Sequence, residues 1–344
     1  MGLAYSACAE GACGRSAVSE CGLLDSLTAA EGLGDSCGGE GPLCFSPFHA
    51  NTAELRRMSS AVCPEQRRCL SVLFYRAVRD LKPVWMLEDM RTMLALCPED
   101  EDNPQKTYSP SEALLYAIVH DHQPYAQYLL SHFSEEALVD PGERFCSCPT
   151  SAPHLSLAVR YDRPSILSLI LQEALRRPAG GAPGPRGGCV REGNGRTPLH
   201  LACELVRPEA VLLLLGSGAS PEVPDAQGWT PLDVLLEPLR DCAEASRARR
   251  HCLDTLLMFM PRLHFHLRAA LRIEPQRWTG ALGKDHVQFL AGLRPAPLLL
   301  SSMQTVLQQL SPSSFSDSLL QLPIPSSLKP AGLSRGTHRT LHRQ

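Results

Sequence analysis

The 344-residue sequence contains no run of about 18 uninterrupted apolar residues, which is the minimum for a membrane-spanning helix. Its first residues, MGLAYSACAEG, also lack the basic and apolar segments of a secretory signal peptide. A formal net charge of −3 gives no general attraction for nucleic acid. These absences predict a cytoplasmic protein, in the cytosol or associated with vesicles, that neither crosses a membrane nor binds nucleic acid.

Signatures of catalysis are missing as well, since the sequence has no G-x-S-x-G, P-loop or protein-kinase motif. His120, Asp121 and His122 are neighbours that do not share one helix face, so we expect solvated polar surface there. Cys146 and Cys148 form a C-x-C pair whose role stays open between metal or redox chemistry and a plain loop. We therefore expect no enzyme activity, no catalytic residue, no metal and no cofactor.

The fourteen cysteines are not packed as densely as in a small disulfide-stapled domain, which favours reduced thiols. One pattern qualifies the expectation about membranes. Gly2 and Ser6 fit the M-G-x-x-x-[ST] pattern of N-myristoylation, and Cys8 offers a second lipid site. We therefore expect membrane attachment only if Gly2 is myristoylated. A single acyl chain would hold the protein on a membrane only weakly.

A repeat is the most informative feature that the sequence does contain. The segment TPLHLA, which begins at Thr197, recurs as TPLDVL at Thr230, and this spacing of 33 residues is the ankyrin period. Thr197 can cap a helix, and Pro198 suits the first helical position because its missing N–H costs nothing there. His200 is expected to hydrogen-bond the turn between repeats. The structural residues of the motif are Thr197, Pro198, Leu199, His200, Ala202, Gly218, Thr230, Pro231 and Leu232.

Two weaker copies of the repeat precede these. PHLSLAVRYDRPSILSLILQEA carries Ala158 where Ala202 stands, and EALLYAIVHDHQPYAQYLLSHF carries Ala117 there. The sequence thus predicts at least four repeats, starting near 112, 153, 197 and 230. The first two intervals, of 41 and 44 residues, are longer than the ankyrin period and indicate inserted loops, which often lie on the binding face.

The C-terminal part carries two short motifs in a fixed order. Pro297 can open a helix in which Leu298, Ser302 and Val306 follow at i, i+4 and i+8, a narrow stripe with a small residue at its middle. A less favoured frame, one residue later, consists of Leu299, Met303 and Leu307. The second motif consists of Leu322, Pro323, Ile324 and Pro325, followed by Leu328. Its two prolines hold the backbone extended, so we expect it to present the leucine and the isoleucine.

These motifs resemble the elongin-binding box and the cullin-5-selecting LPxP box of SOCS-box proteins, with Ser302 in place of the usual cysteine. Behind ankyrin repeats, they make the chain resemble the adaptors that combine such repeats with a SOCS box. The resemblance covers roughly residues 70 to 333. It rests on FYRAVRDLKPVWMLEDMR, YSPSEALLYAIVHDHQPYAQYLL, HLSLAVRYDRPSIL and the LPIP tail.

The resemblance implies a substrate-recognition subunit of a cullin-RING E3 ubiquitin ligase, which promotes ubiquitination and proteasomal degradation of a client protein. Inosine monophosphate dehydrogenase is its candidate client. The elongin B/C contacts would be Pro297, Leu298, Ser302 and Val306. The cullin-5 contacts would be Leu322, Pro323, Ile324, Pro325 and Leu328. The alternative is a non-catalytic ankyrin scaffold that localises or stabilises an enzyme assembly.

Together these patterns predict an all-α fold, an ankyrin-repeat solenoid with a helical N-terminal cap and a C-terminal SOCS-box-like helical segment. The expected parts are a disordered Gly/Ser/Cys-rich tail (1–65), the helical N-terminal cap (66–100), the repeats with inserted loops (101–240), a C-terminal helical cap or degenerate repeat (241–294), the SOCS-box-like segment (295–333) and a disordered tail (334–344).

Overall fold

The computed structural model describes residues 73–95, 108–139, 153–176 and 195–325. Gly2, Cys146, Cys148 and Leu328 lie outside these described residues, as do both predicted tails. Within the described ranges every regular element is a helix, and the predicted all-α ankyrin solenoid is confirmed. None of the helices in these ranges is both long and apolar enough to cross a membrane.

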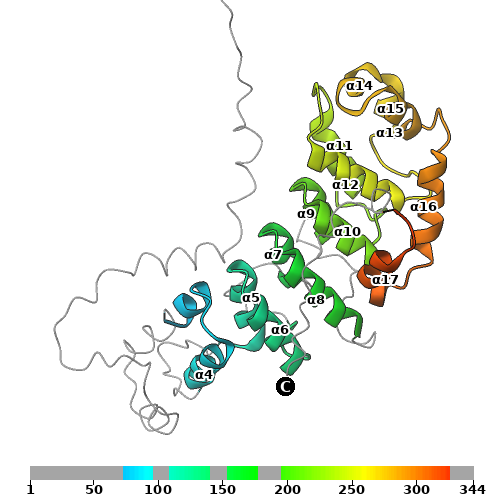
Figure 1. Cartoon of the computed structure of the whole chain (residues 1–344). Helices are drawn as coiled ribbons and strands as arrows, with labels where there is room; N and C mark the ends of the chain where they lie inside the picture. Colours follow the sequence, from blue (N-terminus) through cyan, green and yellow to red (C-terminus); the bar gives the residue numbers. More distant parts are fainter. Residues whose placement is uncertain (1–72, 96–107, 140–152, 177–194, 326–344) are drawn as a thin grey trace, which may run out of the picture.

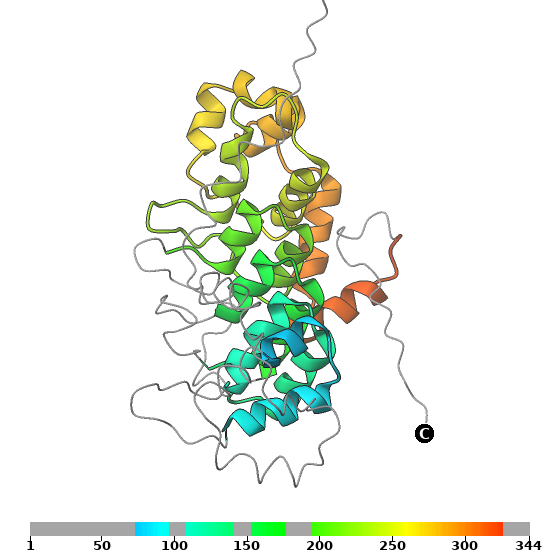
Figure 2. The ribbon, with the colours of Figure 1, turned by 90° about the vertical axis from the view of Figure 1, so that its left-hand side faces the viewer.

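Helix pairs stack side by side in two layers (Figures 1 and 2). The inner layer consists of residues 73–79, α5 (Pro110–Val119), α7 (Pro153–Arg160), α9 (Pro198–Glu204) and α11 (Pro231–Leu236). The outer layer consists of α4 (Val84–Ala95), α6 (Gln123–His132), α8 (Pro164–Arg176), α10 (Pro208–Gly216) and α12 (Arg247–Met258). Within each layer neighbouring helices pack against each other, so one apolar core runs the length of the stack.

The first four pairs share one turn geometry. In each turn an amide donates to the carbonyl oxygen five residues earlier, at 2.8 to 3.0 Å; the donors are Lys82, His122, Arg163 and Arg207, and the acceptors are Ala77, Ala117, Ala158 and Ala202. The residue before each donor has a left-handed φ of 52° to 56°; these are Leu81, Asp121, Asp162 and Val206. Residues 73–95, in the range predicted as a helical cap, therefore form a helix pair of the repeat type.

Side chains at the donor position of this turn tie each pair to the one before it. The His122 ring bonds the carbonyl oxygen of Lys82 at 2.8 Å, and Arg163 donates to the carbonyl oxygens at the end of α5, at 3.0 and 3.3 Å. Arg207 donates to the carboxylate of Asp162 at 3.0 Å. The expectation that His122 is solvated is wrong, because this side chain is buried and also caps α6.

The pair that Thr230 opens has a longer connection between its helices. α11 runs into a short 3-10 helix (Glu237–Leu239), and α12 begins only at Arg247. α12 nevertheless packs on α10 as the outer helix of this pair, although it lies in the range assigned to a cap or degenerate repeat. Three short helices then follow, α13 (Arg268–Ile273), α14 (Gln276–Leu282) and α15 (Lys284–Leu290), with Trp278 fully buried among them.

The chain finally folds back along the outer layer (Figure 1). α16 (Leu298–Gln308) packs against α12, the 3-10 turn Pro312–Ser314 against α8, and α17 (Phe315–Gln321) against α10. Figure 2 shows α16 and α17 along one side of the stack. The C-terminal segment is thus docked on the repeats.

Candidate functional site

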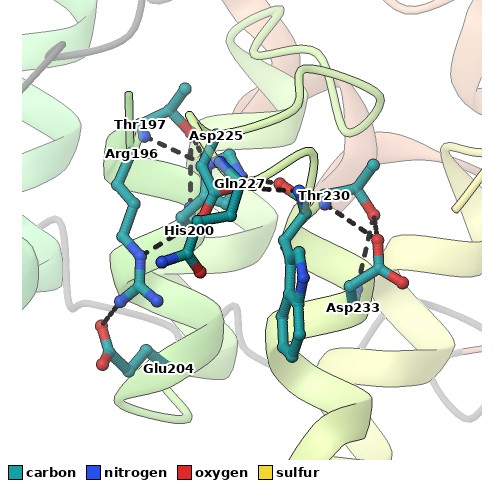
Figure 3. Close-up of polar contacts among 9 residues, drawn as sticks. Arg196, Thr197, His200, Glu204, Asp225, Gln227, Thr230 and Asp233 are labelled. Carbon is teal, nitrogen blue, oxygen red and sulfur yellow. Dashed lines mark hydrogen bonds and ion pairs between the residues drawn. The ribbon is translucent and has the colours of Figure 1, made fainter. Parts of the chain in front are cut away.

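The repeat motif beginning at Thr197 forms a capping network (Figure 3). The Thr197 hydroxyl oxygen accepts the backbone N–H of His200 at 3.3 Å, and Nδ1 of His200 accepts the backbone N–H of Thr197 at 3.1 Å. On its other side, Nε2 of His200 donates to the carbonyl oxygen of Trp229 at 2.9 Å. Burial lowers the pKa of His200, which keeps the ring neutral and so able to accept and donate at once. His200 therefore positions the turn that precedes the next repeat.

That turn is organised around a buried carboxylate. Oδ1 of Asp225 accepts the backbone N–H groups of Gln227 and Trp229, both at 2.9 Å. The guanidinium of Arg196 lies 3.6 Å from the other carboxylate oxygen of Asp225 and also bonds Glu204 (Figure 3). These contacts fix the turn between the fourth and the fifth pair.

The second motif copy uses Asp233 where the first uses His200. The Asp233 carboxylate accepts the backbone N–H of Thr230 at 2.9 Å and its hydroxyl at 2.7 Å. It also accepts the backbone N–H groups of His266 and Leu267, at 3.0 and 2.7 Å. Asp233 is fully buried, so these four bonds replace its hydration. It connects the start of α11 to the start of α13, a link that sequence reasoning missed although Asp in place of His was visible.

The remaining motif residues occupy structural positions. Pro198 and Pro231 are the first residues of α9 and α11. Leu199, Ala202 and Leu232 are buried in the core between the layers. Gly218 follows α10 with a φ of 94°, a conformation that glycine adopts without strain.

The predicted elongin-binding residues lie on the solvent side of α16. Pro297 is the N-cap residue, so the helix begins one position later, at Leu298. The side chain of Leu298 is 87% exposed, Ser302 is exposed and Val306 is half-buried. The Ser302 hydroxyl donates to the carbonyl oxygen of Leu298 at 2.8 Å, which satisfies it within the helix. The structure thus brings Leu298, Ser302 and Val306 together as one stripe, of which the described part of the chain covers only Val306, and that partly.

The opposite face of α16 is anchored to the stack. Met303, Gln304 and Leu307 are buried, and the Gln304 amide donates to the carbonyl oxygens of Leu257 and Met260, at 2.8 and 3.1 Å. Leu257 lies in the last turn of α12, where carbonyl groups lack the usual partner four residues on within the helix, and Met260 lies two residues beyond the helix end. Met303 and Leu307, two residues of the less favoured motif frame, are therefore buried against the chain's own repeats.

A second anchor lies on α17. Phe315 is buried, and its ring packs so closely on Gly216 of α10 that a Cβ at this glycine would collide with it. A separate apolar cluster, called the C-terminal cluster below, consists of Leu212, Met303, Leu307, Phe315 and Leu319. It joins α16 and α17 to the outer layer of the repeats.

The predicted cullin-binding segment has an orientation different from the one expected. Leu322 and Ile324 are half-buried and pack against the C-terminal cluster, whereas Pro323 and Pro325 are exposed. The expectation that the prolines present Leu322 and Ile324 outward is wrong, because the C-terminal cluster offers these apolar side chains burial on their own chain.

The cysteines of the described ranges, Cys203, Cys242 and Cys252, are free thiols. Burial raises the pKa of Cys252 to about 12 and that of Cys203 well above its ordinary value, so both stay protonated and unreactive near neutral pH. No group of three or more metal-ligating side chains occurs within these ranges.

A family model described as ankyrin repeats (many copies) matches residues 189–235. The chain is 42% identical over 299 residues to the mouse protein named Ankyrin repeat domain-containing protein 9, across 78% of this chain and 91% of that one. Two shorter similarities concern the BTB/POZ domain and ankyrin repeat-containing protein NBCL of Lotus japonicus, 50% identical over 42 residues, and human Neurogenic locus notch homolog protein 4, 42% identical over 64 residues. These cover 12% and 18% of this chain, and 9% and 3% of the respective relatives.

Proposed function

The chain belongs to the family of Ankyrin repeat domain-containing protein 9, a protein-interaction adaptor, and on this footing we propose that it is a substrate-recognition subunit of a cullin-RING E3 ubiquitin ligase. Its repeats bind the client protein, and α16 binds elongin B/C. The segment from Leu322 contacts cullin-5. Other subunits transfer ubiquitin to the client, which is then degraded by the proteasome.

The observation that carries this proposal is the two-faced character of α16. One face is fixed to the repeats through Gln304, while the other presents Leu298 and Ser302 to solvent, with Val306 half-buried at the end of the stripe. A leucine exposed to 87% gains about 2 kcal/mol when a partner buries it. The small Ser302 between two aliphatic residues lets a partner approach the helix closely.

The docking of α16 and α17 on the outer layer supports a mechanism based on proximity. Because α16 packs directly on α12 and α17 on α10, a client held by the repeats stays at a restricted distance from the ligase subunits. Such restriction raises the effective concentration of client lysines at the loaded conjugating enzyme. No catalytic residue of this chain takes part.

In this proposal the cullin contact is made by the outward side of the LPIP segment. Pro323 and Pro325 face solvent, and Leu322 and Ile324 hold the segment on the C-terminal cluster. Inosine monophosphate dehydrogenase is the client proposed from the family resemblance, and the cytoplasm is the proposed location.

The test is co-purification of elongin B/C with the full chain and with the double variant Leu298→Ala, Ser302→Phe. We expect the variant to lose elongin B/C while its melting temperature stays unchanged, because both side chains are exposed. The matched control is Thr305→Ala, an exposed position of the same helix outside the stripe. Equal recovery of elongins with the double variant would overturn the proposal.

A second candidate function is a plain ankyrin scaffold that localises or stabilises an enzyme assembly. The inward packing of Leu322 and Ile324 favours it, since it leaves less apolar surface for a cullin. Client half-life separates the two functions. A ligase receptor shortens it, whereas a scaffold changes client location or assembly and leaves the half-life unaltered.

A further inference from the structure

The connection between α12 and α13 alternates between solvated and packed side chains. Arg262, His264 and His266 are exposed. Leu263 and Phe265, which lie between them, are half-buried and pack against the main apolar core. A strand with one face toward water and one toward a core shows this period of two. The connection therefore has the side-chain pattern of a strand, although no strand lies beside it in the described part of the chain.

The backbone of residues 262–266, called the basic connection below, has unpaired donors. The N–H groups of Leu263 and Phe265 have no hydrogen-bond partner among the described residues. In an extended segment the N–H groups of alternate residues point to the same edge, roughly 7 Å apart. Backbone N–H groups are obligatory donors, so these two are available to the carbonyl oxygens of another extended chain.

Two anchors hold the basic connection in place. At its end, the buried carboxylate of Asp233 accepts the backbone N–H groups of His266 and Leu267. Near its start, the side chain of Arg268 donates to the carbonyl oxygen of Leu263 at 2.9 Å. A segment that is already fixed loses little conformational entropy when a partner binds, and this favours binding.

Around the basic connection the chain carries basic side chains without acidic ones. Residues 255–273 contain three arginines and two histidines but no aspartate or glutamate, in a chain whose formal net charge is −3. Arg262 and Arg272 are exposed, and neither guanidinium forms an ion pair within the described residues. The positive potential of this stretch therefore favours an acidic partner.

An aromatic pair borders the basic connection. The rings of Trp229 and His266 stack with their centroids 6.3 Å apart and their planes at 20°. Trp229 is half-buried and belongs to the turn that the Asp225 carboxylate organises. A tryptophan in a fixed position gives a partner a large contact area at low entropic cost. The surface thus combines backbone donors, positive charge and an aromatic ring.

We propose that the basic connection binds an acidic, extended segment of a partner protein. Carbonyl oxygens of that segment accept the N–H groups of Leu263 and Phe265, and its carboxylates pair with Arg262. Trp229 packs against its apolar atoms. The site shares no residue with the exposed stripe of α16, so it goes beyond the proposed ligase function and is equally compatible with the scaffold function.

A nucleic acid is a poorer occupant of this surface. Proteins that bind nucleic acid typically neutralise about six or more phosphates. Arg262, Arg268 and Arg272 are the only residues of 255–273 with a permanent positive charge, and Arg268 is already hydrogen-bonded to Leu263. A short acidic peptide segment matches this small number of charges.

The test uses the full chain and a fluorescently labelled peptide of about six residues in which glutamate and valine alternate. We expect fluorescence anisotropy to show binding of this peptide. The matched peptide, with glutamine in place of glutamate, should bind more weakly by about tenfold or more. Because the proposed pairing uses one edge, the bound peptide should slow hydrogen exchange at the amides of Leu263 and Phe265 but not at that of His264.

Two charge-reversal variants locate the bound peptide. Arg262→Glu should weaken binding by about tenfold or more, because a glutamate there repels the carboxylates of the peptide. Arg247→Glu, at the exposed start of α12, is the matched control and should change the affinity by less than about twofold. Both positions are exposed, so the melting temperature should stay unchanged in each variant.

Three results would overturn the proposal. The first is no binding of the glutamate peptide at concentrations up to about 1 mM. The second is an equal loss of affinity in Arg262→Glu and Arg247→Glu, which would reduce the effect to the overall charge of the chain. The third is a single-stranded oligothymidylate of equal charge that binds more tightly than the peptide and protects the same amides, which would assign the surface to nucleic acid.

Discussion

The ring of Phe315 packs directly on the backbone of Gly216, and this contact joins two residues that are far apart in sequence. Because a Cβ at position 216 would collide with the ring, Gly216→Ala should displace Phe315 and destabilise the chain by about 1–3 kcal/mol. Chemical denaturation measures the loss. Hydrogen exchange should show it as faster exchange in α17.

A double-mutant cycle separates collision from other effects of the alanine. In a Phe315→Ala background the space beside Gly216 is empty, so Gly216→Ala should then cost less than about 0.5 kcal/mol. If the glycine substitution costs the same in both backgrounds, the close packing of the two residues is not its cause.

A second prediction concerns the buried carboxylate of Asp233. Asp233→Asn keeps the shape of the side chain but replaces one carboxylate oxygen with an NH2 group. That group would face N–H or O–H donors instead of accepting from them, so we expect a loss of about 2–4 kcal/mol in the free energy of unfolding. Both α11 and the start of α13 should exchange faster, because Asp233 accepts from each. The matched control is Asp317→Asn, at an exposed position on α17, which should be nearly neutral. A loss confined to α11 would contradict the bridging role.

A third prediction is a dependence of stability on pH. Burial lowers the pKa of His154 to about 4 and also lowers the pKa of His200. Between the ordinary histidine value of about 6.5 and the lowered value, the unfolded chain binds a proton that the folded chain does not. Stability is therefore full above about pH 6.5 and falls as the pH drops toward 4, by up to about 1.4 kcal/mol per pH unit for each histidine.

Urea denaturation at a series of pH values checks this slope. His154→Gln retains a donor for the carbonyl oxygen of Ser111 but does not titrate. The free energy of unfolding should therefore change less steeply with pH in this variant, by the contribution of one proton. An unchanged slope in this variant would show that His154 is not the group responsible.

A fourth prediction contrasts the two faces of α16. Leu298→Ala should change the free energy of unfolding by less than about 0.5 kcal/mol, because the side chain is exposed. Leu307→Ala, on the same helix, should cost about 2–4 kcal/mol because it opens a cavity in the C-terminal cluster. Thermal or chemical denaturation of the two variants decides the matter. Similar losses in both would mean that α16 is docked by another face.

Local patterns made the repeat motif readable from the sequence. The capping of Thr197, the place of Pro198 at the helix start and the inward positions of Leu199 and Ala202 all depend on residues within one turn of helix. The period of 33 residues depends only on the regular size of the unit.

What escaped prediction depends on contacts between distant segments or on a broken period. The residues before 240 give no sign that α12 completes the last pair, since its connection to α11 departs from the tight turn of the earlier pairs. The inward packing of Leu322 and Ile324 depends on a cluster more than a hundred residues away at Leu212. The repeat character of residues 73–95 was partly visible, since the alanine, valine and arginine beginning at Ala77 recur at Ala158.

The slot that Phe315 fills has a consequence for synthesis on the ribosome. α10 emerges about a hundred residues before Phe315, so Gly216 and the apolar side of α10 stay uncovered while the intervening helices are made. A nascent chain that stalls after α12 and before α17 carries every helix pair of the stack but leaves an apolar patch open on its outer layer. Chaperones that recognise such surfaces would be able to distinguish an unfinished chain from a finished one by α10 alone.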